Sequence, residues 1–264
     1  MPILPQDNPR AGHRTYYRIA DLVVSFDSGR GRLYKQARAY ELPSQSPPPK
    51  VDLVIDIPDD FFERKLRENP HLTPDSLLYI LTGIDFIRSI LDFNGIGLHA
   101  SAVVCDGRAY LFSADSGVGK STHTQLWCRH FGRDRAFILN DDKPVIRLVD
   151  GAWYVYGTPW SGKSDLNRPL RVPLAAIAFL RRGIEDTIHP MTPSEAVYPF
   201  LSQTLRPAGG EQMEDALDRM VRLLKTIPIF QLSCTPTTGA VRVAYAAMRD
   251  ARPLEQLPPG VRDE

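Results

Sequence analysis

The chain has 264 residues, 43% of them hydrophobic, and a formal net charge of +1. This length and composition predict one sizeable domain with a packed core, with room for a small appendage. Because the net charge is near zero, we expect neither nucleic acid nor an anionic membrane to bind the chain in bulk. Three widely spaced cysteines and an N-terminus without a signal-peptide pattern favour a reducing, cytoplasmic location.

The first part of the chain predicts a small, mostly β N-terminal region over residues 1–70. Leu22–Phe26 and Val51–Ile57 have the composition of strands, and the proline-rich segment Pro43–Pro49 connects them. A long helix is predicted over Pro74–Phe93, with Thr73 as its cap. Charged residues make this helix too polar to span a bilayer, so it is expected to be buried.

The second domain is predicted over residues 71–251, followed by a loose tail over 252–264. Two hairpins are expected where Asp-Gly pairs separate apolar runs, at Asp106–Gly107 and Asp150–Gly151. Helices are expected after Lys120, after the capping box at Thr192, and in two later segments. Strands and helices mix throughout, so the fold class is α/β with a mixed sheet and β-hairpins. The remaining strands are predicted at residues 98–104, 109–113, 136–140, 145–149, 153–156, 174–180 and 229–233.

Two segments resemble a phosphate-binding loop. The strict pattern G-x-x-x-x-G-K-[ST] occurs at Gly157–Ser164, whereas Ala114–Ser121 begins with Ala. Context favours the second segment, because it follows an apolar strand and leads into an amphipathic helix. The first segment contains Pro159, which has no N–H, and the bulky Trp160. We therefore predict nucleotide binding at Ala114–Ser121 and a structural or substrate-side role for Gly157–Ser164. The predicted nucleotide-binding residues are Ser116, Gly117, Val118, Gly119, Lys120, Ser121 and Thr122.

A pair of carboxylates follows the next apolar strand. Asp141 and Asp142 stand where a Walker B strand places a carboxylate beside Mg²⁺. One can hold the metal and the other can accept a proton from an attacking hydroxyl, although a turn or helix cap is the simpler alternative. The residues alone do not decide which of the two is the base. His99, on the strand before the loop, is either a packed histidine or a group near the phosphates.

Taken together, these segments resemble the superfamily of HPr kinase/phosphorylase and phosphoenolpyruvate carboxykinase. The resemblance rests on Leu98–Ala102, Ser116–Ser121 and Asn140–Asp142 in this order, and it extends over roughly residues 95–180. It implies a P-loop kinase core of the HPr kinase/carboxykinase type that uses ATP and Mg²⁺. Gly157–Lys163 also looks like the matching segment of small HPr-kinase-like proteins associated with peptide biosynthesis.

The resemblance also implies roles for single residues. Asp141 matches the proposed catalytic base, Asp142 and Ser121 the metal ligands, and His99 a metal-side histidine. Lys120 takes the catalytic role of the loop lysine. Three residues are predicted to lie on the substrate side of the site: Trp160, Lys163 and Arg181. For Lys163 and Arg181, an equally good alternative is that they are exposed charged residues of loops without a role in the site.

The sequence therefore predicts a kinase that transfers the γ-phosphoryl group of ATP to a hydroxyl of a peptide, a protein or a small molecule. A nucleotide-binding sensor or scaffold without turnover is the main alternative, and carboxykinase chemistry is a third. We expect no nucleic-acid or membrane partner. Members of the related families assemble into homo-oligomers, but the sequence does not specify an interface for this chain.

Overall fold

The computed structural model describes residues 15–44, 47, 49–205 and 210–253. They group into two compact units, Met1–Phe86 and Ile87–Glu264, and the boundary falls inside helix α3 (Pro74–Ser89). The domain limits predicted from the sequence near residues 70 and 251 remain a prediction. Most of the predicted tail and part of the proline-rich connector lie outside the described residues.

The N-terminal unit combines a three-stranded sheet with helices. Strand β2 pairs antiparallel with β1 and parallel with β3, around buried side chains such as Tyr17 and Phe26. The expectation of a mostly β region was therefore wrong, because helices α1 and α2 were missed and only two residues of the predicted strand at 51–57 pair. The elements are β1 (Thr15–Ile19), β2 (Leu22–Phe26), α1 (Arg32–Ala37), η1 (Arg38–Tyr40), β3 (Leu53–Val54) and α2 (Asp59–Glu68).

Helix α2 carries a signal that the sequence reading overlooked. Asp59 and Asp60 stand in its first turn and Lys65 and Arg67 in its last, which complements the helix dipole at both ends. Lys65 also forms an exposed ion pair with Glu68, 2.7 Å between Nζ and Oε2. Charge order along the segment, more than its apolar content, predicts this helix.

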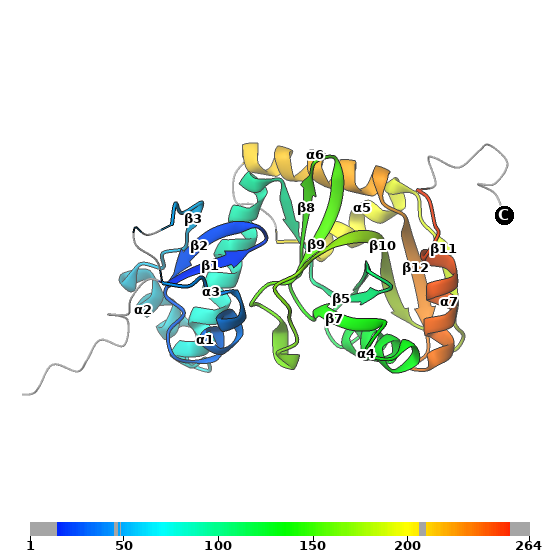
Figure 1. Cartoon of the computed structure of the whole chain (residues 1–264), viewed down its shortest axis with the longest axis horizontal. Helices are drawn as coiled ribbons and strands as arrows, with labels where there is room; N and C mark the ends of the chain where they lie inside the picture. Colours follow the sequence, from blue (N-terminus) through cyan, green and yellow to red (C-terminus); the bar gives the residue numbers. More distant parts are fainter. Residues whose placement is uncertain (1–14, 45–46, 48, 206–209, 254–264) are drawn as a thin grey trace, which may run out of the picture. The chain divides into compact units, whose positions relative to one another are not determined.

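The second unit is built on a nine-stranded mixed sheet (Figure 1). Its strands are β4 (Gly95–Gly97), β5 (Ala100–Cys105), β6 (Arg108–Ser113), β7 (Ala136–Asn140), β8 (Val145–Val149), β9 (Ala152–Tyr156), β10 (Arg171–Arg182), β11 (Thr187–Pro190) and β12 (Ile229–Cys234). The long strand β10 joins two parts of the sheet. Its beginning pairs antiparallel with β9, and its end runs parallel to β6 and β12.

Both predicted hairpins are confirmed, joining β5 to β6 and β8 to β9. At each turn the Asp and the Gly both have positive φ, 49° and 75° in the first and 48° and 81° in the second. Two successive positive φ values define the type I′ turn, which Asp-Gly adopts readily.

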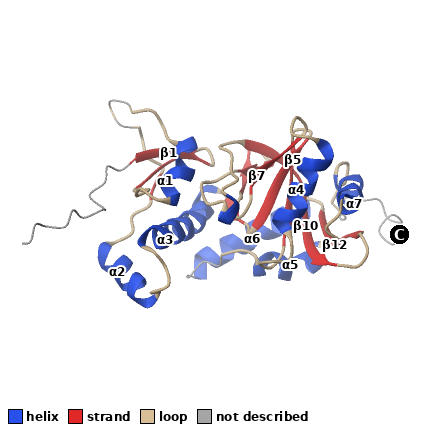
Figure 2. Ribbon diagram, turned by 90° about the horizontal axis from the view of Figure 1, so that it is seen from below, coloured by secondary structure: helices blue, strands red, loops and turns tan. Residues whose placement is uncertain are grey.

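Helices cover both faces of this sheet (Figure 2). Alternate side chains of β5 and β6 enter two cores, as the period of two in a strand requires. Ala102 and Leu111 face one core with α5 and α6, and Val103 and Phe112 face the other with α4 and α7. The helices are α4 (Lys120–Phe131), α5 (Pro193–Ser202), α6 (Gly210–Thr226) and α7 (Thr238–Met248), together with the short η2 (Ile90–Phe93) and η3 (Gly162–Ser164).

Strand direction brings the predicted site together. Strand β5 lies between β6 and β7 and runs antiparallel to both, so the start of β5 meets the ends of β6 and β7 at one edge. Ala100 pairs with Ser113, and Ala102 pairs with Asn140. In the described part of the chain, no helix has the length and apolarity needed to cross a membrane.

Candidate active site

The loop after β6 contains two glycines whose backbone conformation requires glycine. Gly117 and Gly119 have φ of 82° and 125°, a region that side chains disfavour, and open space surrounds both. Helix α4 begins directly afterwards at Lys120, and no side chain caps its N-terminus. The first N–H groups of a helix have no intrahelical partner and carry the positive end of the dipole. The strand–loop–helix setting predicted for Ala114–Ser121 is thus present.

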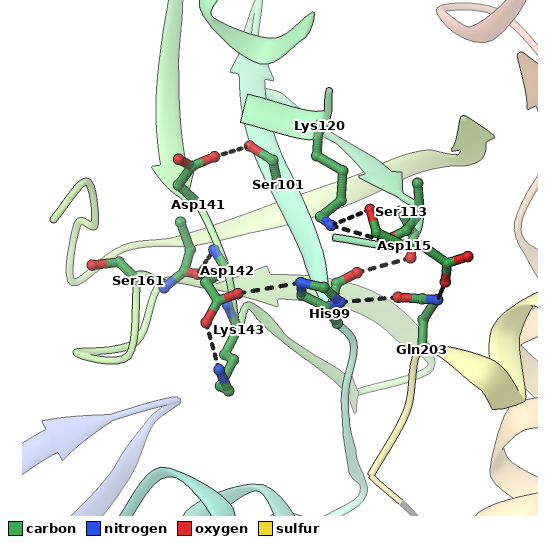
Figure 3. Close-up of polar contacts among 12 residues, drawn as sticks. His99, Ser101, Ser113, Asp115, Lys120, Asp141, Asp142, Lys143, Ser161 and Gln203 are labelled. Atoms are coloured by element: carbon green, nitrogen blue, oxygen red, sulfur yellow. Dashed lines mark hydrogen bonds and ion pairs between the residues drawn. The ribbon is translucent and has the colours of Figure 1, made fainter. Parts of the chain in front are cut away.

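Lys120 is folded into this loop and is only 8% exposed. Its Nζ donates to the carbonyl oxygens of Ala114, at 2.8 Å, and Asp115, at 3.3 Å (Figure 3). Burial lowers the pKa of Lys120, and the carboxylates of Asp142, Asp115 and Asp141 oppose this shift. The loop thus holds a buried lysine between backbone carbonyls and three carboxylates.

Asp141 is linked by side-chain hydrogen bonds to α4, the helix that follows the loop. The Ser101 hydroxyl donates to Asp141 Oδ1 at 2.5 Å and lies 2.7 Å from the Thr124 hydroxyl of α4. All three residues are at least 94% buried, since Asp141, the most exposed, retains 6% of its surface. This chain fixes the Asp141 carboxylate relative to α4.

Asp142 and the phosphate loop are joined through His99 and Gln203 (Figure 3). His99 Nε2 lies 3.4 Å from Asp142 Oδ1, and its Nδ1 lies 2.9 Å from Gln203 Oε1. Gln203 Nε2 in turn donates to Asp115 Oδ1 at 2.7 Å. Gln203 stands at the C-terminal end of α5, so this helix holds the histidine against the loop.

These contacts determine the ring nitrogen of His99 that carries a proton. Gln203 uses its amide N–H for Asp115, so its oxygen accepts from Nδ1–H of His99. Burial lowers the pKa of His99, and the charge of Lys120 adds to this shift, while Asp142 and Gln203 oppose it. Because Nδ1–H faces Gln203, Nε2 and the Asp142 carboxylate lie side by side.

The residues present fit a hard divalent cation. Mg²⁺ prefers oxygen ligands and typically takes one or two from the protein, with phosphate oxygens and water completing its shell. Asp142 keeps 19% of its side chain exposed, and its Oδ2 forms an ion pair with Lys143. Ser121 is half-buried in the first turn of α4. Among the described residues no group of three or more His, Cys, Asp or Glu side chains could hold a metal by itself.

The strict Walker pattern at Gly157–Ser164 is a packed loop beside the carboxylates. Thr158, Trp160 and Ser161 are fully buried, and a Cβ on Gly157 would lie 1.9 Å from the Arg168 carbonyl oxygen. The loop therefore has no room for a phosphate group.

Asn140 attaches this loop to the Asp pair. Its amide donates to the Thr158 carbonyl at 2.9 Å, and its oxygen accepts from the backbone N–H groups of Asp142 and Lys143. Gly162 packs so closely on Asp142 that an added Cβ would lie 2.8 Å from the Asp142 Cβ. The loop thus determines the direction in which Asp142 points.

The three predicted substrate-side residues lie in different surroundings. Trp160 has no exposed surface, so in this structure it packs the loop and does not contact an acceptor. Lys163 is exposed in η3, next to Gly162 and therefore close to Asp142. Arg181 is exposed beside Ser233 on β12 and has no hydrogen bond or ion pair to the Asp pair among the described residues.

Arg182, which the sequence reading passed over, contacts the phosphate loop instead. Its Nη2 donates to the Gly117 carbonyl at 2.6 Å, and its Nε lies 3.5 Å from the Val118 carbonyl. Arg182 ends β10, which runs parallel to β6, so the two strands deliver the arginine and the loop to the same edge. Strand alternation turns neighbouring residues to opposite faces, which separates Arg182 from Arg181.

A pocket of about 350 Å³ adjoins the loop at the exposed Thr122. Its wall includes Gly119, Leu126, Arg182 and the segment after β12, at Cys234–Pro236. His123 also lines it, and burial lowers the pKa of this histidine to about 4. The pocket thus continues from the phosphate loop along one side of α4, with a volume within the range of small-molecule sites.

Comparisons with known proteins give matches among solved structures alone. No protein-family model and no curated protein sequence matches the chain. Among solved structures, the chain is similar to the Hpr(Ser) kinase/phosphatase from Coxiella burnetii, at 10% sequence identity and a TM-score of 0.30. The match covers 57% of this chain and 96% of that one. This likeness is too distant to assign a family or an activity.

Proposed function

We propose that the chain is a P-loop kinase of the HPr kinase/carboxykinase type, which transfers the γ-phosphoryl group of ATP to a hydroxyl of a peptide, a protein or a small molecule. The observation that carries the proposal is the meeting of Lys120 with Asp141 and Asp142 at one edge of the sheet. A pure nucleotide binder needs the loop, but it has no need of a second, rigidly held carboxylate.

ATP would lie with its phosphates on the loop and its nucleoside in the pocket beside Thr122. The N–H groups of Gly117–Ser121 and the N-terminus of α4 would bind the phosphate oxygens. Lys120 would move from the carbonyls of Ala114 and Asp115 to the β- and γ-phosphates. Arg182 would add positive charge at the same loop.

Ser121 and Asp142 would hold Mg²⁺, with His99 next to Asp142. When bound, the metal ion would neutralise charge on the β- and γ-phosphates. Asp141 would orient the acceptor hydroxyl and take its proton on the carboxylate oxygen that Ser101 leaves free. Rate acceleration would come mainly from positioning and charge stabilisation, which suits the fixed hydrogen bonds around both carboxylates.

The substitution Asp141→Asn tests the proposed base. It keeps the shape of the side chain and removes its ability to accept a proton, so we expect kcat to fall by about 100-fold or more. The dissociation constant of Mg-ATP should change by less than about threefold, because Asp141 does not contact the nucleotide. ³¹P NMR of protein with Mg-ATP and an acceptor panel would measure transfer, and titration calorimetry would measure binding. The panel would hold free serine, threonine, inositol and serine-containing peptides.

Asp150→Asn is the matched control, because Asn suits the type I′ turn that Asp150 occupies. This variant should keep full transfer. An equal loss of transfer and of nucleotide binding in Asp141→Asn would contradict the assignment of the base. Mg-ATP binding by the wild type, with neither transfer nor hydrolysis, would favour a sensor or scaffold.

A further inference from the structure

A second groove lies on another side of α4, separate from the pocket beside Thr122. Its volume is about 640 Å³, which is ample for several amino-acid side chains. Gln125, Cys128 and Arg129 of α4 form one wall, and β7 with the segment Asp165–Arg168 forms the other. The groove therefore follows the helix that begins at the phosphate loop.

The groove is strongly basic. Arg129, Arg133 and Arg168 line it, and Asp165 is the one carboxylate in its wall. Within the described ranges none of these arginines forms an ion pair with a carboxylate. Exposed arginines without carboxylate partners are available to an anionic ligand.

Two observations indicate that these charges converge. The Arg168 guanidinium lies 4.3 Å from the centre of the Phe137 ring, which orients it by cation–π attraction. Burial raises the pKa of the Cys128 thiol, and Arg168 and Arg133 both oppose this shift. Positive potential from two arginines on different segments thus reaches one point of the groove wall.

The wall of the groove is hydrogen-bonded to the backbone of Asp141, the proposed base. Leu166 lines the groove, and its carbonyl accepts from the backbone N–H of Asp141 at 3.2 Å. Asn167, also in the wall, donates to Ser161 at 2.9 Å. Gln125 stands four residues after Ser121, so both lie on the same side of α4. A chain bound here would pass close to Asp141 without crossing the nucleotide pocket.

We infer that this groove binds an acidic segment of a peptide acceptor, and thereby delivers a nearby hydroxyl to Asp141. The delivery of the hydroxyl to Asp141 rests on the proposed kinase function, whereas the binding of the acidic segment does not. The arginines would pair with Asp or Glu side chains of the peptide, while Phe137 and Leu166 would contact its apolar parts. Arginine suits such pairing because its planar fork matches a carboxylate.

Fluorescence anisotropy with labelled serine-containing peptides tests this inference. The probes are a peptide with four glutamates around the serine and the same peptide with four glutamines. The wild type should bind the acidic peptide at least about tenfold more tightly than the glutamine peptide. This difference in affinity should shrink as the salt concentration rises, because salt screens the charges. The variant R129Q/R133Q/R168Q should lose this preference. The variant R222Q/K225Q/R242Q removes three charges from α6 and α7 and should keep it.

Mg-ATP affinity, measured on the same samples, separates misfolding from loss of the groove. The triple groove variant should bind Mg-ATP like the wild type. Equal binding of both peptides by the wild type, or an unchanged preference in the groove variant, would overturn the inference. Displacement of the peptide by citrate at equal carboxylate concentration would reassign the groove to a small polyanion. Because no phosphoryl transfer is measured, failure of the kinase proposal would leave these binding results intact.

Discussion

Arg182 shows how one side chain can support the phosphate loop from outside the loop sequence. Its guanidinium donates to the Gly117 carbonyl at 2.6 Å, so it stabilises the turn and brings a positive charge beside it. Arg182→Gln should weaken Mg-ATP binding by about fivefold, which corresponds to about 1 kcal/mol for an exposed charge-assisted hydrogen bond. Titration calorimetry would measure the change.

The preceding arginine offers a control for this prediction. Arg181→Gln removes the same charge from the opposite face of β10 and should leave Mg-ATP affinity unchanged. If both substitutions weaken Mg-ATP binding equally, the loss would be explained by the removal of a positive charge and not by the specific contact of Arg182 with the loop.

The residues that sequence reasoning could identify are those with a local signature. Lys120 stands in a glycine loop after a strand, and Asp141 and Asp142 end the next apolar strand, so spacing alone indicated them. Ser101, Gln203 and Lys143 had no such signature. Gln203 reaches His99 across 104 positions of sequence, and such a contact depends on how α5 packs on the sheet. The residues alone left the role of His99 open for the same reason, and only the resemblance assigned it to the metal side of the site.

Helix α5 is the element that places Gln203, and its N-terminus is fixed by a capping box. The Thr192 hydroxyl accepts from the backbone N–H of Glu195, whose carboxylate accepts from the backbone N–H of Thr192. Thr192→Ala should lower the free energy of unfolding by about 1 kcal/mol, because it leaves an N–H of the first turn without a partner. Urea denaturation followed by circular dichroism would measure this loss.

Ser194→Ala is the matched control in the same turn of α5. Ser194 is exposed, and this substitution should change stability by less than about 0.5 kcal/mol. A loss of equal size in the two variants would contradict a specific role for the Thr192 cap and point to helix propensity instead.

Elements with strong local signals were predicted well. The two Asp-Gly turns, the capping box and the proline at the start of α3 gave hairpins and helix starts that the structure confirms. The strands missed in the second unit are short. Strands β4 and β11 have three and four residues, and they are strands because neighbours pair with them. Pairing of this kind is a tertiary property that no local window contains.

At the scale of the whole molecule, charge is distributed unevenly although the net charge is +1. Three arginines gather along one side of α4, while Lys120 is surrounded by three carboxylates near the start of the same helix. The near-zero net charge predicts no bulk attraction to anions. Composition does not predict the local electrostatic potential, because this potential depends on which strands and loops lie next to α4.

The division into two units predicts where a nucleotide stabilises the chain. All proposed contacts of Mg-ATP lie in the unit Ile87–Glu264. A ligand that binds only the folded state raises the free energy of unfolding by about 2.7 kcal/mol at one hundred times its dissociation constant. Hydrogen exchange followed by mass spectrometry should therefore slow in peptides from residues 87–253, and much less in those from 15–86. Lys120→Ala, which removes the lysine proposed to bind the phosphates, should abolish the slowing. Equal slowing in both sets of peptides would contradict this prediction. It would mean that the two units unfold as one cooperative body, because residues that do not contact the nucleotide would also exchange more slowly.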